Sequence, residues 1–124
     1  MNAGDVIEAV LESGHRARFT ATGDSMYPFI RSGEQLEVEP VDESELRRGD
    51  VVLARLGRGL TAHRVVRIER RDGRVVSITT RGDNCHSDDD SFSPDQLVGR
   101  ISLRRRRNLV TIIALARRWV RRAR

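Results

Sequence analysis

The chain contains no lysine, because all 23 of its basic residues are arginine. A serine nucleophile needs a neighbouring base to take its proton. Any such base in this chain must therefore be a histidine or a carboxylate. The exclusive use of arginine is most simply explained by codon bias in a GC-rich genome, rather than by selection for phosphate contacts at every position.

Cysteine, aromatic residues and long apolar runs are also scarce. The single cysteine, Cys85, excludes an intramolecular disulfide and fits a reducing compartment. Aromatic residues make up 4% of the chain, which argues against an aromatic platform for stacking bases. No run reaches the roughly 20 apolar residues of a membrane-spanning helix, and acidic residues interrupt the N-terminal stretch MNAGDVIEAVLESG. We therefore expect neither a signal peptide nor a membrane anchor, and a cytoplasmic protein.

The formal net charge of +5 is not evenly spread along the chain. Residues 104–124 hold nine arginines and no acidic residue, so residues 1–103 carry 5 − 9 = −4. A chain of 124 residues is long enough for one domain with a hydrophobic core. We expect an acidic folded domain over residues 1–103 and an arginine-rich amphipathic tail over residues 104–124.

The tail has an apolar centre with arginines on both sides. In a helix, one face would carry Leu109, Ile112, Ile113, Ala116 and Val120. About ten apolar residues at ~1.5 Å each cover ~15 Å, half of the hydrocarbon core of a bilayer, so the tail cannot span a membrane. Three interpretations stay open: peripheral contact with an anionic membrane, docking on the acidic domain or a partner protein, and disorder. We do not expect nucleic acid to be a partner.

The body of the chain has the patterns of a β-rich domain with one short helix at the front. The helix is expected to begin near Asp5, an N-cap candidate, and to end at Ser13-Gly14. Its apolar face consists of Val6, Ile7, Val10 and Leu11.

The remaining pattern predicts strands. The second and third of them are expected to form a hairpin through a polar loop, and Asp72-Gly73, between two β-branched runs, is a strong signal for a further hairpin. An acidic loop, residues 83–96, precedes the last strand. The fold class is mainly β, with a short N-terminal helix and a basic C-terminal helical tail. The expected strands are residues 16–22, 35–41, 51–56, 61–70, 75–82 and 97–103.

Ser25 is the candidate nucleophile, in the stretch TGDSMYP at residues 22–28. A serine beside glycine and aspartate is also common turn chemistry. Pro28 would stiffen the backbone just past the serine, and Met26 could be buried beneath the loop. Both features would hold the hydroxyl in a fixed direction, as a nucleophile requires.

A base for Ser25 must come from the three histidines, His15, His63 and His86. His15 follows the expected helix end among arginines and is interpreted as a surface residue. His63 lies within a strand, which is a rigid support for a side chain. The stretches RGDN at residues 81–84 and DDD at residues 88–90 supply carboxylates that could fix its tautomer. His63 is therefore the candidate base.

Four stretches follow one another along the chain: GDSMYPFIRSGE, ELRRGDVVLAR, HRVV, and TRGDN with DD downstream. This order resembles the sequence boxes of the type I signal peptidase and LexA-like serine peptidase superfamily, over roughly residues 16–103. The resemblance implies a compact signal-peptidase or LexA-like β-fold. In the branch similar to archaeal and endoplasmic-reticulum signal peptidases, a histidine followed by Arg-Val replaces the lysine base.

On that branch the resemblance implies that Ser25 is the nucleophile and His63 the general base. Asp89 is favoured as the acid that orients His63, with Asp83 as its support. The flanking acids, Asp88 and Asp90, remain alternatives to Asp89.

The resemblance also suggests how an oxyanion would be bound. Gly23 stands where the family often has a hydroxyl, so the oxyanion hole would depend on backbone N–H groups, including that of Ser25.

The function that the resemblance implies is a bacterial serine endopeptidase that cleaves a leader, signal or precursor peptide through an acyl-enzyme. Its substrate would bind as an extended strand, with small side chains flanking the cut. Three alternatives stay open: a self-cleaving regulator of the LexA type, an inactive peptide-binding module with the same fold, and a nucleic-acid binder that uses the arginine tail.

The acidic loop also permits a metal interpretation, with Cys85, His86, Asp88 and Asp90 as ligands. These residues mix soft and hard ligand types, and no second cluster completes a site. We therefore expect no metal and no cofactor.

Overall fold

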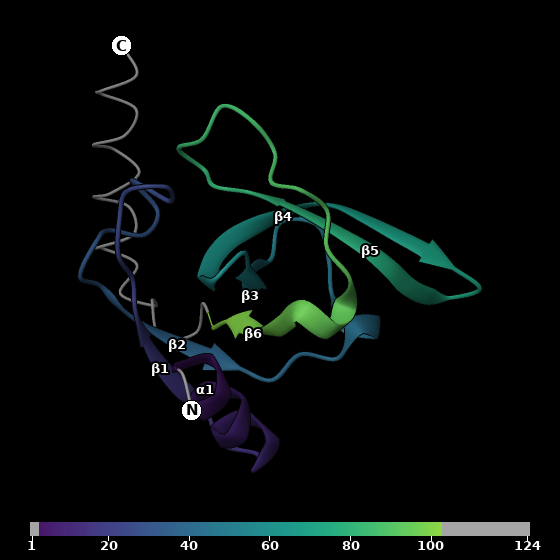
Figure 1. The fold of residues 1–124 in the computed structure, drawn as a ribbon, viewed down its shortest axis with the longest axis horizontal. Coiled ribbons are helices and arrows are strands. Elements are labelled where there is room, and N and C mark those ends of the chain that lie inside the picture. Colours follow the sequence, from purple (N-terminus) through teal and green to yellow (C-terminus); the bar gives the residue numbers. More distant parts are fainter. Residues whose placement is uncertain (1–2, 103–124) are drawn as a thin grey trace.

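The computed structural model describes residues 3–102, which form one antiparallel six-stranded sheet with a helix packed beside it (Figure 1). The strand order in the sheet is β1-β2-β6-β3-β4-β5. The elements are α1 (Ala3–Glu12), β1 (Ala17–Thr20), β2 (Gln35–Glu39), η1 (Glu43–Glu45), β3 (Val51–Leu56), β4 (Gly59–Arg71), β5 (Arg74–Arg81), η2 (Pro94–Gln96) and β6 (Leu97–Ile101). The mainly β fold with a short N-terminal helix is confirmed, whereas the tail expected over residues 104–124 lies outside the described residues.

The hairpin of β4 and β5 turns at the two residues that the sequence indicates. Asp72 has a φ of 52° and Gly73 a φ of 78°. Two central residues with positive φ match the right-handed twist of the flanking strands. The outer end of this hairpin projects away from the rest of the molecule (Figure 1).

The expected hairpin of β2 and β3 is wrong, because β6 lies between these two strands. Val38 of β2 pairs with Ile101 of β6, and Leu53 of β3 pairs with Gly99 of β6. The physical reason lies in β3, whose first four residues are buried on both faces of the sheet. The backbone N–H and C=O groups of such a buried strand cannot bond to water, so the strand needs a partner along each edge, and β6 supplies the partner on one side.

Two hydrophobic clusters form the core, and β3 contributes side chains to both of them in alternation. The first cluster consists of Ile7, Leu11, Ala17, Ala21, Met26, Ile30, Leu36, Val38, Val51, Leu53, Val98 and Ile101. The second consists of Leu46, Val52, Ala54, Val65, Val75, Ile78 and Phe92. The first cluster lies under the candidate site described below.

Helix α1 packs against β1 and β6. Ile7 and Leu11 are buried as expected, but Val6 is 48% exposed, so its placement on the apolar face is wrong. Asp5 is inside the helix rather than at its cap, and its carboxylate pairs with Arg55 of β3 at 3.1 Å. The helix therefore uses its acidic side for docking as well as its apolar side.

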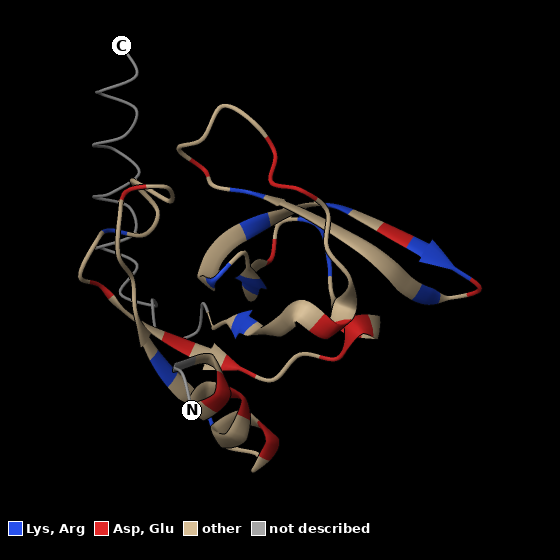
Figure 2. Ribbon diagram, in the orientation of Figure 1, with Lys and Arg blue, Asp and Glu red and all other residues tan. Residues whose placement is uncertain are grey.

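Acidic residues lie along α1 and β2 and in the loop between β5 and η2 (Figure 2). On β2 they are neutralised across the sheet, since Glu37 pairs with Arg16, and Glu39 pairs with both Arg16 and Arg100. No helix within residues 3–102 is long and apolar enough to cross a membrane.

Candidate active site

Ser25 lies in a tight loop that follows β1. The Tyr27 N–H donates to the Asp24 carbonyl at 3.1 Å, and the Ile30 N–H donates to the Met26 carbonyl at 2.9 Å. Met26 is 3% exposed and belongs to the first core cluster, as the sequence indicates. The loop is thus closed on itself and anchored next to the serine, so the hydroxyl of Ser25 has a defined direction.

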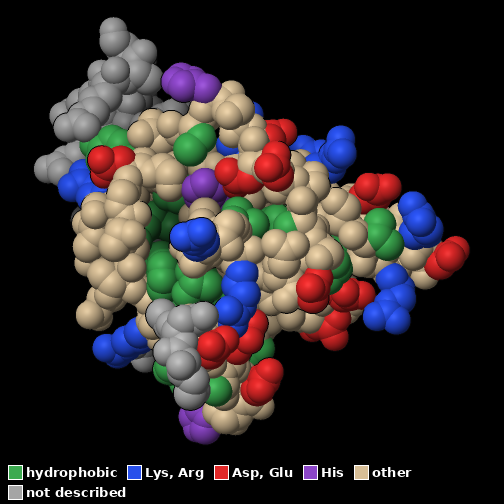
Figure 3. Space-filling model, viewed as in Figure 1, with side chains coloured by type: hydrophobic (Ala, Val, Ile, Leu, Met, Phe, Trp, Pro, Cys, Tyr) green, Lys and Arg blue, Asp and Glu red, His purple; other side chains and the backbone are tan. Residues whose placement is uncertain are grey.

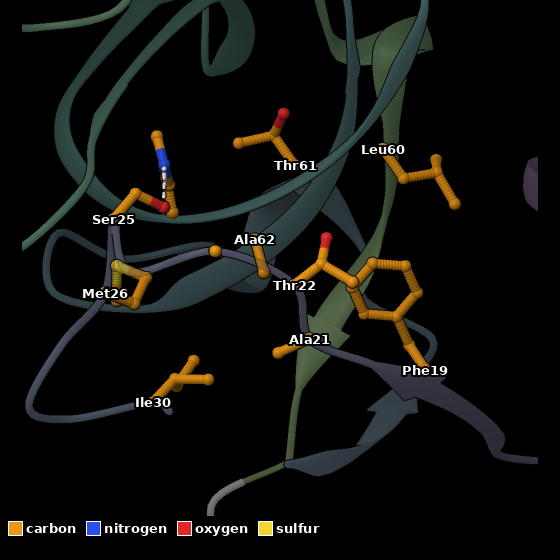
Figure 4. Close-up of a pocket in the computed structure, with 11 residues that line it drawn as sticks. Phe19, Ala21, Thr22, Ser25, Met26, Ile30, Leu60, Thr61 and Ala62 are labelled. Atoms are coloured by element: carbon orange, nitrogen blue, oxygen red, sulfur yellow. Dashed lines mark hydrogen bonds between the residues drawn. The ribbon is translucent and has the colours of Figure 1, made fainter. Parts of the chain in front are cut away.

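His63 brings its imidazole to this hydroxyl from β4. It pairs with Val52 in the sheet and is 7% exposed. Its Nε2 lies 3.0 Å from the Oγ of Ser25, which is within hydrogen-bond reach (Figure 4). Its Nδ1 lies 2.6 Å from Oδ2 of Asp89. The structure therefore brings Ser25, His63 and Asp89 into one hydrogen-bonded chain.

Asp89 is held in place by β5. Its N–H donates to the Thr80 carbonyl at 2.8 Å, and the Thr80 hydroxyl donates to its Oδ2 at 2.8 Å. Thr80 is 1% exposed. The sequence analysis missed this residue, although a buried threonine on a strand leading into the Gly-Asp-Asn stretch is a signal for it.

The neighbouring acids do not share this position. Asp88 lies 3.6 Å from Arg81, with about half of each side chain exposed. Asp90 has no hydrogen bond or ion pair to the imidazole within the described part of the chain. The other two histidines are exposed, and His15 bonds the hydroxyl of Ser13 instead.

Asp83 is not brought to the imidazole or to Asp89. Both of its carboxylate oxygens accept hydrogen bonds from Arg64, each at 2.8 Å. The same guanidinium donates to the Gly49 carbonyl at 2.8 Å and lies 4.7 Å from the ring centre of Phe29. The hydrogen bond to Asp83 raises the pKa of Arg64 above its ordinary value.

Arg64 therefore joins the four stretches on which the sequence analysis depended. Phe29 comes from the serine loop, Gly49 from the turn before β3, and Asp83 from the Gly-Asp-Asn turn, while Arg64 itself follows His63. The sequence analysis did not assign a role to this arginine. Its position directly after the candidate base was the available signal.

The Gly-Asp-Asn turn is also hydrogen-bonded directly to the serine loop. The Asn84 N–H donates to the Ser25 carbonyl at 2.8 Å, and its side-chain amide donates to the Asp24 carbonyl at 3.0 Å. A Cβ at Gly82 would lie 2.6 Å from the Ser25 carbonyl oxygen and 3.0 Å from Nε2 of His63. Only glycine lets the turn approach the loop this closely.

A cleft of about 250 Å³ opens beside Ser25 and His63. Figure 3 shows hydrophobic side chains gathered in a hollow on the face that is viewed, and Figure 4 shows the cleft running between the β1 end of the serine loop and the first residues of β4. Its lining is Phe19, Ala21, Thr22, Gly23, Ser25, Met26, Ile30, Leu60, Thr61, Ala62 and His63. Most of these side chains are apolar or small.

One side of the cleft is an open strand edge. β4 pairs with β3 from Gly59 onward, but its pairing with β5 begins only at Arg64, which lies opposite Arg81. Residues 60–63 therefore have no strand on their second side within the described part of the chain, and all four line the cleft. An extended peptide can add to such an edge through its backbone.

The metal interpretation of the acidic loop has no support in the geometry. Among residues 3–102, no three side chains of histidine, cysteine, aspartate or glutamate are grouped so that they could hold a metal ion. Asp89 instead bonds Thr80 and His63, and Asp88 pairs with Arg81.

Comparison with models of protein families gives a match over most of the sequence. The family model described as Peptidase S24-like matches residues 4–101, which is nearly all of the described chain. No curated protein matches the sequence. Because the family model covers most of the sequence, the chain belongs to the Peptidase S24-like family, and its resemblance to the LexA-like and signal-peptidase-like serine peptidase superfamily is confirmed.

Proposed function

We propose that this protein is a serine endopeptidase that uses Ser25, His63 and Asp89, and that it belongs functionally to the histidine-using branch of its superfamily. The single observation that carries the proposal is the hydrogen-bonded chain from Ser25 Oγ to His63 Nε2, and from His63 Nδ1 to Asp89. A nucleophile within reach of a base, and a base oriented by a third group, is the arrangement needed for acyl transfer.

The proposed reaction begins when Nε2 of His63 takes the proton of Ser25 and Oγ attacks the substrate carbonyl. Asp89 accepts the Nδ1–H of His63 and stabilises the imidazolium that forms. The imidazolium then gives its proton to the leaving amine, which leaves an acyl-enzyme on Ser25. Water, activated by the same imidazole, releases the acyl group and regenerates the serine.

The oxyanion is proposed to bind to backbone N–H groups of the serine loop. Gly23 has a φ of 82°, which a residue with a hydroxyl side chain rarely adopts. The N–H of Ser25 has no acceptor within the described residues, so it is free to donate to an oxyanion.

The substrate is proposed to be a leader, signal or precursor peptide that binds in extended form along residues 60–63. The open edge of β4 offers backbone hydrogen bonds next to the reacting serine. The apolar lining of the cleft favours apolar side chains near the cut, and the family resemblance favours small ones.

The test is cleavage of a degenerate peptide library, followed by mass spectrometry, with Ser25→Ala and His63→Gln as variants. Loss of the nucleophile or the base should lower the rate by at least about a thousandfold. Cleavage by the parent protein should depend on pH, because only the neutral imidazole can take the proton of Ser25. A rate that is flat from acid to alkaline pH would contradict the assignment of His63 as the base.

The same experiment separates the alternatives. Peptide binding without cleavage, unchanged in Ser25→Ala, would favour an inactive peptide-binding module. A loss of mass from the purified protein at raised pH, absent in Ser25→Ala, would favour a self-cleaving regulator.

A further inference from the structure

Thr80 is a buried polar residue behind the proposed catalytic groups. It lies on β5, one residue before the end of the strand, and is 1% exposed. Its hydroxyl donates to Oδ2 of Asp89 at 2.8 Å. The oxygen that receives this bond is also the one that lies 2.6 Å from Nδ1 of His63.

We propose that Thr80 is a positioning residue that fixes the carboxylate of Asp89 for its hydrogen bond to His63. The proposal rests on the proposed function, because it assigns Thr80 a part in the same site. Thr80 does not touch a substrate or a reacting atom, and it acts only through Asp89.

Two groups converge on Oδ2 of Asp89, the Thr80 hydroxyl and Nδ1 of His63. A carboxylate rotates about the Cα–Cβ and Cβ–Cγ bonds of its side chain unless its oxygens are held. The backbone of Asp89 is held by its N–H bond to the Thr80 carbonyl, and Oδ2 is held by the Thr80 hydroxyl. One residue thus fixes both ends of Asp89, and Oδ2 stays aimed at Nδ1.

The exposure of Asp89 makes this constraint necessary. Its side chain is 25% exposed, whereas that of His63 is 9% exposed. Without the hydroxyl, the carboxylate would be free to turn toward water and leave Nδ1 without its acceptor. The buried Thr80 hydroxyl gives the carboxylate a hydrogen bond that holds its oxygen in place.

The neighbouring Thr79 provides a matched comparison on the same strand. It is 8% exposed, and its hydroxyl bonds the hydroxyl of Ser91 at 2.6 Å. Thr79 and Thr80 therefore both tie β5 to residues 89–91, but only Thr80 reaches the carboxylate. A purely structural role would make the two residues equivalent.

The experiment compares Thr80→Val, Thr80→Ser and Thr79→Val. Two measurements are made on each: kcat and KM on a library-derived peptide, and the pH titration of the His63 imidazole by ¹⁵N NMR of the full-length protein. The His63 imidazole is also titrated in Cys85→Ser, as a control for the thiol, because the Cys85 thiol and Nε2 of His63 both border Gly82. Thr80→Ala serves as a second hydroxyl-free variant if the valine variant does not fold.

Removal of the Thr80 hydroxyl should lower kcat by about tenfold, with little change in KM. The imidazole should lose its proton at a lower pH, because it loses stabilisation by a correctly aimed carboxylate. Thr80→Ser should restore both properties, and Thr79→Val should leave both unchanged.

Several results would overturn the proposal. One is a titration in Thr80→Val that is unchanged or shifted to higher pH, and another is an equal effect of Thr79→Val. If the parent protein cleaves no peptide, the proposed function fails, but the NMR titration still decides whether Thr80 holds Asp89 against His63.

Discussion

Gly82 is the residue where the backbone of the Gly-Asp-Asn turn passes closest to the proposed catalytic groups. Its φ is not in the left-handed region, so the requirement for glycine comes from space rather than from backbone conformation. A Cβ there would lie 2.6 Å from the Ser25 carbonyl oxygen, 2.7 Å from Sγ of Cys85 and 3.0 Å from Nε2 of His63. All three contacts are shorter than van der Waals separation.

We predict that Gly82→Ala lowers peptide cleavage by about 100-fold, because it pushes Ser25 and His63 apart. The free energy of unfolding should fall by about 1–3 kcal/mol from overpacking. Activity assays and chemical denaturation measure the two effects.

Gly59→Ala is the matched control for this prediction. A Cβ at Gly59 meets no atom within 4 Å, and its φ is also outside the left-handed region. Both activity and stability should therefore stay near those of the parent protein. Equal losses in the two variants would show that the close approach at Gly82 is not the cause.

The residues of the site were predictable to different degrees. Ser25, His63 and Asp89 were named from the sequence because a family resemblance supplied their order, and the geometry brings them together. Asp83 was expected beside Asp89, but it binds Arg64. Spacing along the chain cannot decide which of two nearby carboxylates turns inward, because that choice depends on partners from other strands.

At the scale of elements, Arg64 joins β4 to three other segments. Its side chain is 28% exposed, and that of Asp83 is 24% exposed. A bidentate ion pair of this kind is only partly screened by water, so it contributes more to the free energy of unfolding than an exposed ion pair does. The guanidinium also covers the ring of Phe29 in the serine loop.

We predict that Arg64→Gln lowers the free energy of unfolding by about 1–2 kcal/mol and also lowers activity. The pKa of Arg64 is raised by its hydrogen bond to Asp83, so the contribution of this guanidinium is lost only as pH rises through that raised value. The free energy of unfolding of the variant should therefore lie below that of the parent protein by the same amount at about pH 6 and at about pH 9. Urea denaturation at the two pH values measures it.

Arg81→Gln serves as the control, since it removes an arginine of the adjacent strand. Arg81 lies 3.6 Å from Asp88, and both side chains are about half exposed. An exposed pair of this kind contributes little, so stability should change by less than about 0.5 kcal/mol. A loss as large as that of Arg64→Gln would refute the role assigned to Arg64.

Local sequence patterns predicted individual strands and turns correctly, but they did not predict which distant strands pair in the sheet. The alternation of residues 16–22 and the Asp72-Gly73 turn both have local causes, and both are found in the structure. The expected hairpin of β2 and β3 is wrong because β6, which begins at Leu97 and so 46 residues after Val51, the first residue of β3, lies between them. The predicted burial of Val6 is wrong, because the apolar stripe that the helix turns toward the sheet is narrower than the apolar face that its sequence offers.

At the scale of the whole molecule, the sheet order explains why the site is assembled from distant stretches. β6 pairs with both β2 and β3, so the serine loop after β1 and the histidine strand β4 come to lie on the two sides of one cleft. The first core cluster forms the floor between them. The cleft is therefore a product of the complete sheet, and no single motif of the sequence predicts it.

We predict that a chain ending at Leu103 unfolds with the same midpoint as the full chain and cleaves peptides at the same rate. Within residues 3–102, both core clusters consist of residues between Ile7 and Ile101, and the proposed catalytic residues lie in the same range. Thermal unfolding and peptide assays on the two chains measure this. A lower midpoint would instead favour docking of residues 104–124 on the folded domain.

Residues 104–124 are proposed to make peripheral contact with anionic membranes, which the same pair of chains tests. The tail carries nine positive charges and the rest of the chain a net charge of −4, so the two parts should respond oppositely to an anionic surface. The full chain should sediment with phosphatidylserine vesicles and not with phosphatidylcholine vesicles, while the chain ending at Leu103 should bind neither. Added salt should weaken this binding, because counterions screen the arginines. If the full chain also fails to bind, lipid is excluded as the partner of the arginines, and a protein partner becomes the remaining docking hypothesis.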